Sequence, residues 1–530
     1  MAPRLVILGW DSATFDVAAP LMDAGRLPAL KHIVDTGASA PLRSTWPPIT
    51  DCAWTSAFTG CNPAKHGIFG SWYRAPGAYA IRYFSSRDRR APALWEMSPD
   101  ARFLVWNVPM TYPPSAVNGA MLAGYGAPPH GRISEPVELQ KELGEQWPLD
   151  DLLDRAPQGS LDGFLADLLR GLELQPDAMR WAADRSAADC VVAVWPHVDR
   201  AQHFFWRFRD TQHELADAVE RVYVAMDRAT QRLLDAWPDA DFLVVSDHGA
   251  GPLNGDVNVG AWLVRNGRAV PARPTSAPLA KVAWHLPPRV RRIAKRIAPV
   301  AARKTVESSL SQQLGSFDWK QTDAFVGFHG DLWLNLTGRE PEGRVPVSAK
   351  GDVLAELADG LAAIVDPDTG RPVFSAIHER DSIYAGDFID LAPDAMLDSW
   401  SQGYRVAPKR GPEGPLVIPP LALSGVREAW SSDHRPIGIF AAAGPRIRSA
   451  RLEELSLYDV CPTALALLGS PVARTIDGVA ATGAIAEEWL RSHPIATRDE
   501  HFSTTNEQPG YSADEARAVA EHLKDLGYIE

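Results

Sequence analysis

The sequence has few cysteines, no long apolar run and no excess of basic residues. Each of these absences excludes a class of protein. Four cysteines in 530 residues form no C-x-x-C pair, which excludes a disulfide scaffold and makes a reducing compartment the simpler expectation. No stretch reaches about 18 uninterrupted apolar residues, and LVILGW near the N-terminus is too short for a signal core or a membrane span. These features predict a cytoplasmic protein with no integral membrane segment.

The charge balance is acidic, with 53 basic side chains against 66 acidic ones and a formal net charge of −13. This balance argues against a surface that coats nucleic acid, so we expect no nucleic-acid partner. It is compatible with a small phosphate-containing substrate, because bound metal ions reverse the local field. With 45% hydrophobic residues, the chain can bury the core of two to four domains, or of one large domain with insertions.

Three short apolar runs lead into aspartates. RLVILGWD ends at Asp11, DCVVAVWPHVD at Asp199 and DFLVVSD at Asp247. Helical patterns such as residues 213–237 separate these runs, so they are predicted to be buried strands of a mainly parallel sheet in an α/β fold. Ligands bind beyond the carboxyl ends of the strands in such folds, and we therefore expect the three aspartates to converge.

The strand pattern stops after residue 252 and resumes at RPIGIFAAAG, residues 435–444. We expect four parts: a core from residues 1–252, an inserted subdomain from 253–425, the rest of the core from 426–490 and a helical tail from 491–530. The insertion contains a basic segment, residues 284–304, that prolines interrupt. We interpret it as a solvated helix, with contact to an anionic substrate or a membrane surface as the alternative.

Two pairs of residues have the spacing of metal ligands. Asp199 and His203 are four residues apart in HVDRAQHFFW, so they share one face of a helix and either bind one ion or form an ordinary helix-face pair. Asp247 and His248 are adjacent in VVSDHGAG, where the strand ends and Gly249 permits an irregular turn. Carboxylates with imidazoles suit zinc, with manganese and iron as alternatives.

One further histidine, His434 in SSDHRPIG, precedes the resumed strand. A lone histidine is usually structural or solvated, but this one completes a set. Six residues then supply three ligands for each of two ions, with a place for a nucleophile: Asp11, Asp199, His203, Asp247, His248 and His434.

Several motifs occur in an order that resembles a known group of enzymes. They are GWDSATFD, T-x4-TS-x-FTG-x-NP-x-KHGIFG, DR-x-QHFFW, SDHG and HRPIGIF. Together they resemble the alkaline phosphatase superfamily, most of all its type I phosphodiesterase/nucleotide pyrophosphatase branch and the bacterial intracellular proteins of that branch. The resemblance covers nearly the whole chain. It implies a two-zinc hydrolase with an α/β core, in which helices sandwich a mainly parallel sheet, and with an inserted cap subdomain.

The resemblance places Thr50 in the position of the nucleophile, ten residues before Gly60. A hydroxyl at a helix N-terminus lies in the positive end of the helix dipole, and a metal-bound hydroxyl can be deprotonated near neutral pH. The resemblance also divides the ligands between two zinc ions, with Asp11, Thr50, Asp247 and His248 on one and Asp199, His203 and His434 on the other.

Ser71 marks a departure from the branch, which has an asparagine shortly after the HG-I turn that binds a non-bridging phosphate oxygen. Counting along IFGSW places Ser71 there, so it is predicted to bind substrate, although its shorter side chain calls for a bridging water. Thr55 and Thr59 are expected to satisfy backbone groups. His66 is expected to be structural or to support a ligand.

The leading functional hypothesis is hydrolysis of a phosphodiester or phosphoanhydride through a covalent phosphothreonine at Thr50. A phosphomonoesterase or a phosphonate ester hydrolase on the same two-metal core is the alternative. The C/S-x-P-x-R pattern of sulfatases is missing around Thr50. A binding protein without catalysis is a third hypothesis, but a chain that does no chemistry has no reason to keep Thr50 beside both sets of ligands.

Overall fold

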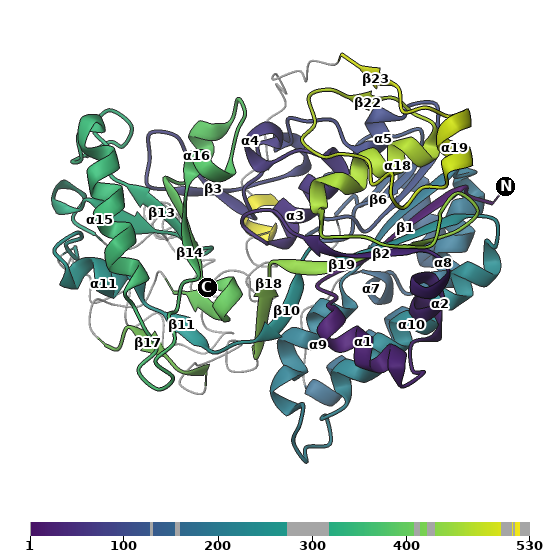
Figure 1. The fold of residues 1–530 in the computed structure, drawn as a ribbon, viewed down its shortest axis with the longest axis horizontal. Helices are drawn as coiled ribbons and strands as arrows, with labels where there is room; N and C mark the ends of the chain where they lie inside the picture. Colours follow the sequence, from purple (N-terminus) through teal and green to yellow (C-terminus); the bar gives the residue numbers. More distant parts are fainter. Residues whose placement is uncertain are drawn as a thin grey trace, which may run out of the picture.

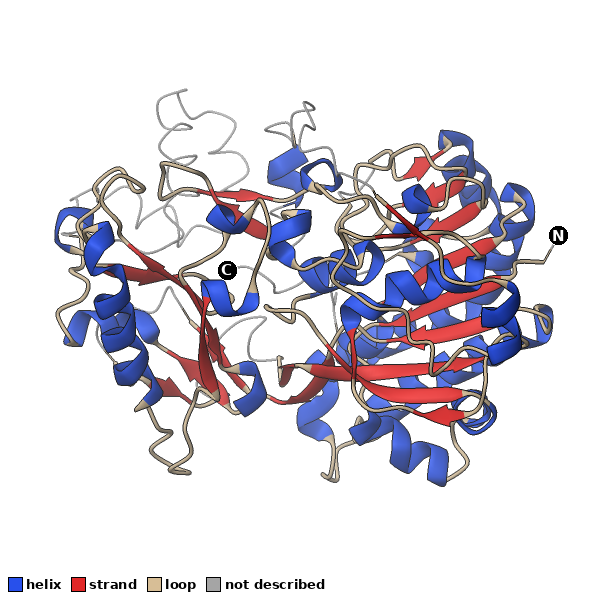
Figure 2. Cartoon of the chain, turned by 45° about the horizontal axis from the view of Figure 1, so that its top comes forward, coloured by secondary structure: helices blue, strands red, loops and turns tan. Residues whose placement is uncertain are grey.

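The computed structural model of the protein describes residues 2–127, 131–153, 160–272, 317–407, 414–420, 430–499, 511 and 515–519. Its central feature is a twisted sheet in the lobe that holds the N-terminus (Figures 1 and 2). Along one path through this sheet the strands are β20 (Ala450–Arg451), β2 (Ala38–Arg43), β19 (Ile437–Ala443), β9 (Asp241–Val245), β1 (Leu5–Trp10), β8 (Cys190–Trp195), β5 (Phe103–Trp106), β6 (Gly119–Leu122) and β7 (Ser134–Glu135).

The middle of this sheet is parallel. Strand β1 pairs in parallel with β8 on one side and with β9 on the other, and β8 continues in parallel to β5. Strand β19 is antiparallel to β9, as is β7 to β6. Every residue of β1, β8 and β9 is buried, as expected of strands covered on both faces. The predicted α/β fold with a mainly parallel sheet is therefore confirmed.

Helices cover both faces of the sheet (Figure 1). On one face, α18 (Val460–Leu468) packs against β1, α3 (Thr50–Thr59) and α5 (Leu94–Met97). On the other, α2 (Pro28–Thr36) packs against β19 and β2, and α8 (Leu161–Ser186) packs against β5 and β6. Helix α10 (Ala218–Ala236) lies over α2, α8 and α9 (His197–Phe205), and it begins five residues later than the helical sequence pattern.

The buried carboxylate of Asp227 connects helices α10 and α2 through hydrogen bonds. Helix α2 has no side-chain cap of its own, and Asp227 of α10 accepts hydrogen bonds from the backbone N–H groups of Ala29 at 3.1 Å and Leu30 at 2.7 Å. Burial, partly offset by these bonds, raises the pKa of Asp227 from 3.8 to about 6. The carboxyl group is therefore best tolerated in its neutral form, and its stabilising effect falls as the pH rises through about 6.

We expect Asp227→Ala to lower the free energy of unfolding by about 2 kcal/mol at pH 5, because two N–H groups lose their acceptors. The loss should shrink at pH 7, where the ionised carboxylate of the wild type is penalised by burial. Urea unfolding at the two pH values measures both terms. Asp235→Ala, an exposed change in the same helix, serves as the control and should have little effect. A larger loss at pH 7 than at pH 5 would contradict this account.

A second lobe is built from residues of the predicted insertion. It holds β11 (Gly255–Val257), β16 (Tyr404–Val406) and β17 (Val417–Ile418) in one small sheet, and β12 (Ala324–Val326), β13 (Asp331–Leu334), β15 (Ala395–Asp398) and β14 (Ala376–Glu379) in another. Helices α11 (Val259–Arg265) and α15 (Lys350–Ala362) cover them (Figure 1). Most of their apolar side chains lie in clusters separate from that of the main sheet, although Ile418 of β17 belongs to the main-sheet cluster. The exact division into core, cap and tail stays a prediction.

The hairpin of β3 (Trp72–Arg74) and β4 (Ile81–Tyr83) contacts this second lobe. Arg74 pairs with Glu340 at 3.1 Å, and both side chains are almost fully buried. Its guanidinium also lies over the ring of Trp333, 4.6 Å from the centroid. The segment that follows α3 therefore links the main sheet to the insertion.

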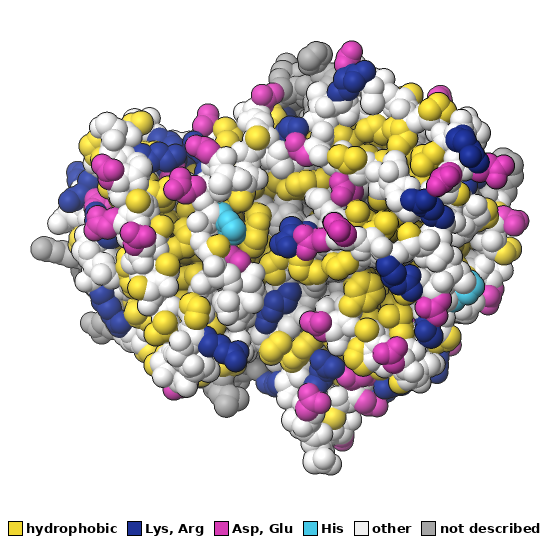
Figure 3. All heavy atoms as spheres, viewed as in Figure 1, with side chains coloured by type: hydrophobic (Ala, Val, Ile, Leu, Met, Phe, Trp, Pro, Cys, Tyr) yellow, Lys and Arg dark blue, Asp and Glu magenta, His cyan; other side chains and the backbone are white. Residues whose placement is uncertain are grey.

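Other sequence predictions concern the surface and the ends of the chain. The basic segment 284–304 lies outside the described residues. Of the predicted tail, residues 491–499, 511 and 515–519 are described, with 515–519 helical. Within the described parts, no helix combines the length and apolarity needed to cross a bilayer. Basic and acidic side chains are interspersed on the face shown in Figure 3. All four cysteines are buried and free.

Candidate metal centre

The three predicted aspartates lie at the carboxyl ends of three adjacent strands. Asp11 directly follows β1, Asp247 lies two residues beyond the end of β9, and Asp199 lies in the first turn of α9, which follows β8. Because β1 is hydrogen-bonded to both β8 and β9, these ends meet at one edge of the sheet. All three side chains are buried. The expected convergence of the aspartates is found in the structure.

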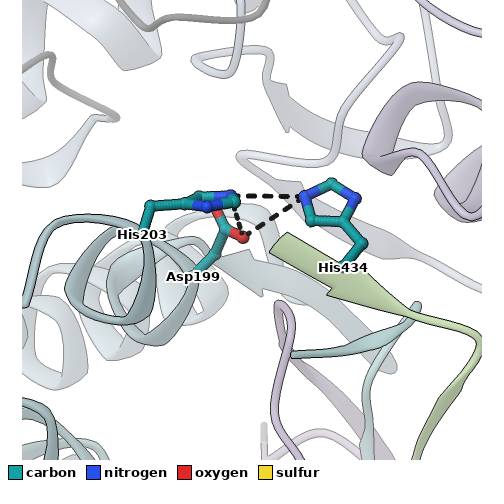
Figure 4. Close-up of side chains that lie close together, drawn as sticks. All are labelled: Asp199, His203 and His434. Carbon is teal, nitrogen blue, oxygen red and sulfur yellow. Dashed lines mark hydrogen bonds and ion pairs between the residues drawn. The ribbon is translucent and has the colours of Figure 1, made fainter. Parts of the chain in front are cut away.

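One group of candidate ligands consists of Asp199, His203 and His434 (Figure 4). Helix α9 carries Asp199 and His203 one turn apart, and β18 (Ser432–Arg435) carries His434. His203 Nε2 and His434 Nε2 lie 3.0 and 3.7 Å from Asp199 Oδ1, and 3.3 Å from each other. The three side chains point toward a common centre, so they can share one ion.

The second group consists of Asp11, Asp247 and His248. His248 Nε2 lies 3.2 Å from Asp247 Oδ2 and 3.9 Å from Asp11 Oδ1. The Thr50 hydroxyl lies 3.4 Å from the same Nε2. This group thus combines two carboxylates, one imidazole and one hydroxyl, as the sequence predicts.

The two groups are neighbours. Strand β10 (Gly249–Pro252) runs antiparallel to β18, and the imidazoles of His248 and His434 stack with their centroids 3.7 Å apart and their planes at 19°. The described part of the chain therefore brings all seven predicted ligands into one buried site. Two adjacent ions could be held there, one by each group.

Backbone carbonyl groups orient all three histidines. The Nδ1 atoms of His203, His248 and His434 lie 3.0, 3.1 and 2.8 Å from the carbonyl oxygens of Ser432, Gly249 and Pro48. A carbonyl oxygen only accepts, so each Nδ1 carries the proton and donates it. Each Nε2 then presents a lone pair to its group, which is the state that a metal ligand requires.

The two aspartates at the ends of β1 and β9 each have one oxygen held and one oxygen available. Trp54 Nε1 donates to Asp11 Oδ2 at 3.0 Å, and the Ser12 backbone N–H donates to Asp247 Oδ1 at 3.2 Å. Asp11 Oδ1 and Asp247 Oδ2 are buried and have no hydrogen-bond partner within the described ranges. Unsatisfied buried carboxylate oxygens are costly, and a bound cation would satisfy them.

The pKa values of the buried aspartates, in the protein without ions, also favour the binding of cations. Burial, together with the facing carboxylates, raises the pKa values of both Asp11 and Asp247 well above their ordinary range. Burial also acts to raise the pKa of Asp199, but a positive charge on the imidazole of His203, where a bound ion would lie, outweighs this effect together with Arg200 and lowers the pKa. Carboxylate oxygens and neutral imidazole nitrogens in this number fit zinc or a similar divalent ion.

Thr50 is the first residue of α3, as the sequence predicts, and its side chain is buried. The other hydroxyls of this helix behave differently, since Thr55 Oγ1 donates to the Asp51 carbonyl and Thr59 Oγ1 to the Thr55 carbonyl. His66 is equally engaged, with Nε2 2.8 Å from Ser56 Oγ and Nδ1 accepting from the Ile68 N–H. In helix α3, Thr50 is thus the threonine whose hydroxyl faces the candidate ligands.

Ser71 is buried and lies next to Asp51, the residue that follows Thr50. Burial raises the pKa of Asp51 to about 6, while a hydrogen bond from the Ser71 hydroxyl acts in the opposite direction. A serine has one hydroxyl proton, so while it is donated to Asp51 it cannot also be donated to a phosphate oxygen. The substrate-binding role of Ser71 stays a prediction.

Supporting residues were missed by the sequence analysis. Trp54 reaches Asp11 because Gly9 leaves room for it: a Cβ on Gly9 would lie 2.5 Å from Trp54 Cη2. Ser12 adopts a positive φ of 65°, and this turn aims its N–H at Asp247. Gly9, the first residue of GWD, and Ser12, which follows it, were the available signals. The carbonyl partners of the histidines leave no signal in the sequence.

The chain is similar to proteins of one known family. A family model described as type I phosphodiesterase / nucleotide pyrophosphatase matches residues 5–419. Murine ectonucleotide pyrophosphatase/phosphodiesterase 5 superposes with a TM-score of 0.50 at 11% identity, covering 91% of this chain and 100% of that chain. The human protein of the same name gives 0.45 at 10% identity, covering 92% and 99%. No curated protein sequence matches. The murine structure supports the α/β fold described above.

Proposed function

The chain belongs to the type I phosphodiesterase/nucleotide pyrophosphatase family of phosphoric ester hydrolases, and from this premise we propose that it acts through a covalent phosphothreonine at Thr50 with two bound metal ions. The observation that carries the proposal is the position of the Thr50 hydroxyl, 3.4 Å from His248 and next to two adjacent groups of buried ligands. The substrate is a small phosphodiester or phosphoanhydride.

The residues fit two zinc ions, with manganese or iron as alternatives. Asp11, Thr50, Asp247 and His248 would hold one ion, and Asp199, His203 and His434 the other. When bound, such ions lower the pKa of the threonine hydroxyl and neutralise negative charge on the attacking and leaving oxygens.

The chain contributes the nucleophile and its placement. Thr50 Oγ1 attacks phosphorus as its proton passes to solvent, an Oγ1–P bond forms, and the bond from phosphorus to the leaving oxygen breaks with the electron pair on that oxygen. Water then attacks the phosphothreonine from the opposite side, and the threonine oxygen leaves and regains a proton. The N-terminus of α3 supplies backbone N–H groups that favour the anionic phosphate.

Assays with two chromogenic esters test this proposal. The zinc-loaded protein, with manganese in parallel, is expected to hydrolyse bis(p-nitrophenyl) phosphate with a kcat/KM at least about tenfold higher than that for p-nitrophenyl phosphate. The reason is that Ile49, Phe328 and Trp400, beside His434, offer apolar surface to the second nitrophenyl group of the diester. Such a preference agrees with a phosphodiesterase. A preference for the monoester would retain the two-metal core and replace the proposed function by a phosphomonoesterase.

A further inference from the structure

A pocket opens beside the candidate metal centre, between the main sheet and the second lobe. His434 and Asp433 line it from β18, and Phe328, Trp400 and Arg405 line it from the second lobe. The ligand group of Asp199, His203 and His434 contributes a side chain, that of His434, to the lining of this pocket. Thr50 lies against the other group, 3.4 Å from His248.

This arrangement assigns a direction to the reaction. In an in-line displacement at phosphorus, the leaving oxygen departs on the side opposite the nucleophile. The nucleophile lies on the His248 side, so the leaving group departs toward the His434 side and into the pocket. The residues of the pocket therefore meet the leaving group rather than the group that stays on Thr50.

Arg405 is the cationic residue of this pocket. Its Nε donates to Asp256 at 3.0 Å, which fixes the guanidinium, and its side chain is 15% exposed. Its Nη2 is buried and has no hydrogen-bond partner among the described residues. The guanidinium also lies 5.9 Å from the ring centroid of Trp430. A fixed arginine with an available N–H group is suited to an anionic oxygen.

The other polar atoms of the pocket limit where that anion can lie. Asp433 Oδ2 and His329 Nε2 are buried and lack hydrogen-bond partners within the described ranges. Because Asp433 repels a second negative charge, the part of the ligand that meets it carries a hydrogen-bond donor such as a hydroxyl. Aromatic rings of Phe328, Trp400 and Trp430 offer apolar contact surface beside these atoms.

Resting on the proposed function, we propose that Arg405 is a specificity-determining residue that binds a phosphoryl oxygen on the leaving group. The preferred substrates are then phosphoanhydrides whose leaving group is a phosphorylated, hydroxyl-bearing compound. A simple aryl diester has no group for Arg405 to bind.

Two substrates that transfer the same uridylyl group test this assignment. UDP-glucose has a sugar phosphate as its leaving group, and uridine 5′-(4-nitrophenyl) phosphate has an aryl alcohol. We expect Arg405→Gln in the metal-loaded full chain to lower the ratio of their kcat/KM values by about 10- to 100-fold, the range of a charge-assisted hydrogen bond. Arg405→Lys, which keeps a cation for Asp256, should lower it less. Arg268→Gln, on an arginine that pairs with Asp323, is the matched control.

Binding gives a second readout that does not depend on turnover. In a Thr50→Ala background, equilibrium dialysis should show that Arg405→Gln weakens UDP-glucose by at least about tenfold while UMP, which lacks the leaving group, binds as before. An unchanged substrate ratio together with unchanged UDP-glucose affinity would overturn the assignment and make Arg405 structural. A wild-type protein that hydrolyses neither these two substrates nor bis(p-nitrophenyl) phosphate would instead refute the proposed function, and this inference with it.

Discussion

Replacing Thr50 by alanine is expected to lower kcat by at least about 1,000-fold on any substrate of the enzyme, because it removes the atom that bonds to phosphorus. The variant should still bind both metal ions, since the six carboxylate and imidazole ligands remain. Metal content per chain, measured by mass spectrometry after dialysis, together with kcat on bis(p-nitrophenyl) phosphate, checks both parts. Thr50→Ser keeps a hydroxyl at the same place and should retain a larger share of the activity.

The matched control for this prediction is Thr55→Val. Thr55 lies in the same helix, is also buried, and has its hydroxyl bound to the carbonyl of Asp51 at 2.7 Å. Its replacement should change stability slightly and leave kcat close to that of the wild type. If Thr50→Ala retained most of its activity with metals bound, Thr50 would not be the nucleophile.

The second large effect is expected from the metal ligands. His434→Ala should reduce the metal content from two ions per chain to about one and lower kcat/KM by at least about 100-fold. The substitution removes one of the three protein ligands of the ion that would neutralise the negative charge on the leaving oxygen. Asp247→Asn should do the same to the other group. In both variants, retention of one ion per chain would show that the unaltered ligand group is still correctly folded.

His66→Gln tests whether the loss is specific to ligands. His66 is buried like His434, but both of its ring nitrogens are hydrogen-bonded to protein groups, Ser56 and Ile68. The His66→Gln variant should therefore keep two ions per chain even if its melting temperature falls. Equal loss of metal from His66→Gln and His434→Ala would show that the loss follows from unfolding rather than from ligation.

Much of the site was predictable because it depends on rules that act over short stretches of sequence. Asp11 and Asp247 follow short apolar runs that are typical of buried strands, and parallel strands bring such residues to one edge. Asp199 and His203 share a helix face because they are four residues apart. Thr50 begins α3, but its role as the nucleophile was implied by the family resemblance and not by a rule of this kind.

The parts that could not be predicted depend on contacts between distant segments. The carbonyl of Pro48 holds a ring 386 residues away, and that of Ser432 holds one 229 residues away. A backbone carbonyl is present at every residue, so nothing in the sequence distinguishes these two. The pocket around Arg405 likewise joins β18 to the second lobe, and its lining could not be inferred from composition or spacing.

In the proposed mechanism, the phosphoryl group is transferred first to Thr50 and then to water. Hydrolysis of a phosphorothioate diester of known configuration at phosphorus, in water enriched in oxygen-18, tests this mechanism most directly. Two successive in-line displacements each invert the configuration, so the account predicts a product with net retention. Net inversion would mean that water attacks the substrate in a single step, and the proposed phosphothreonine would be contradicted.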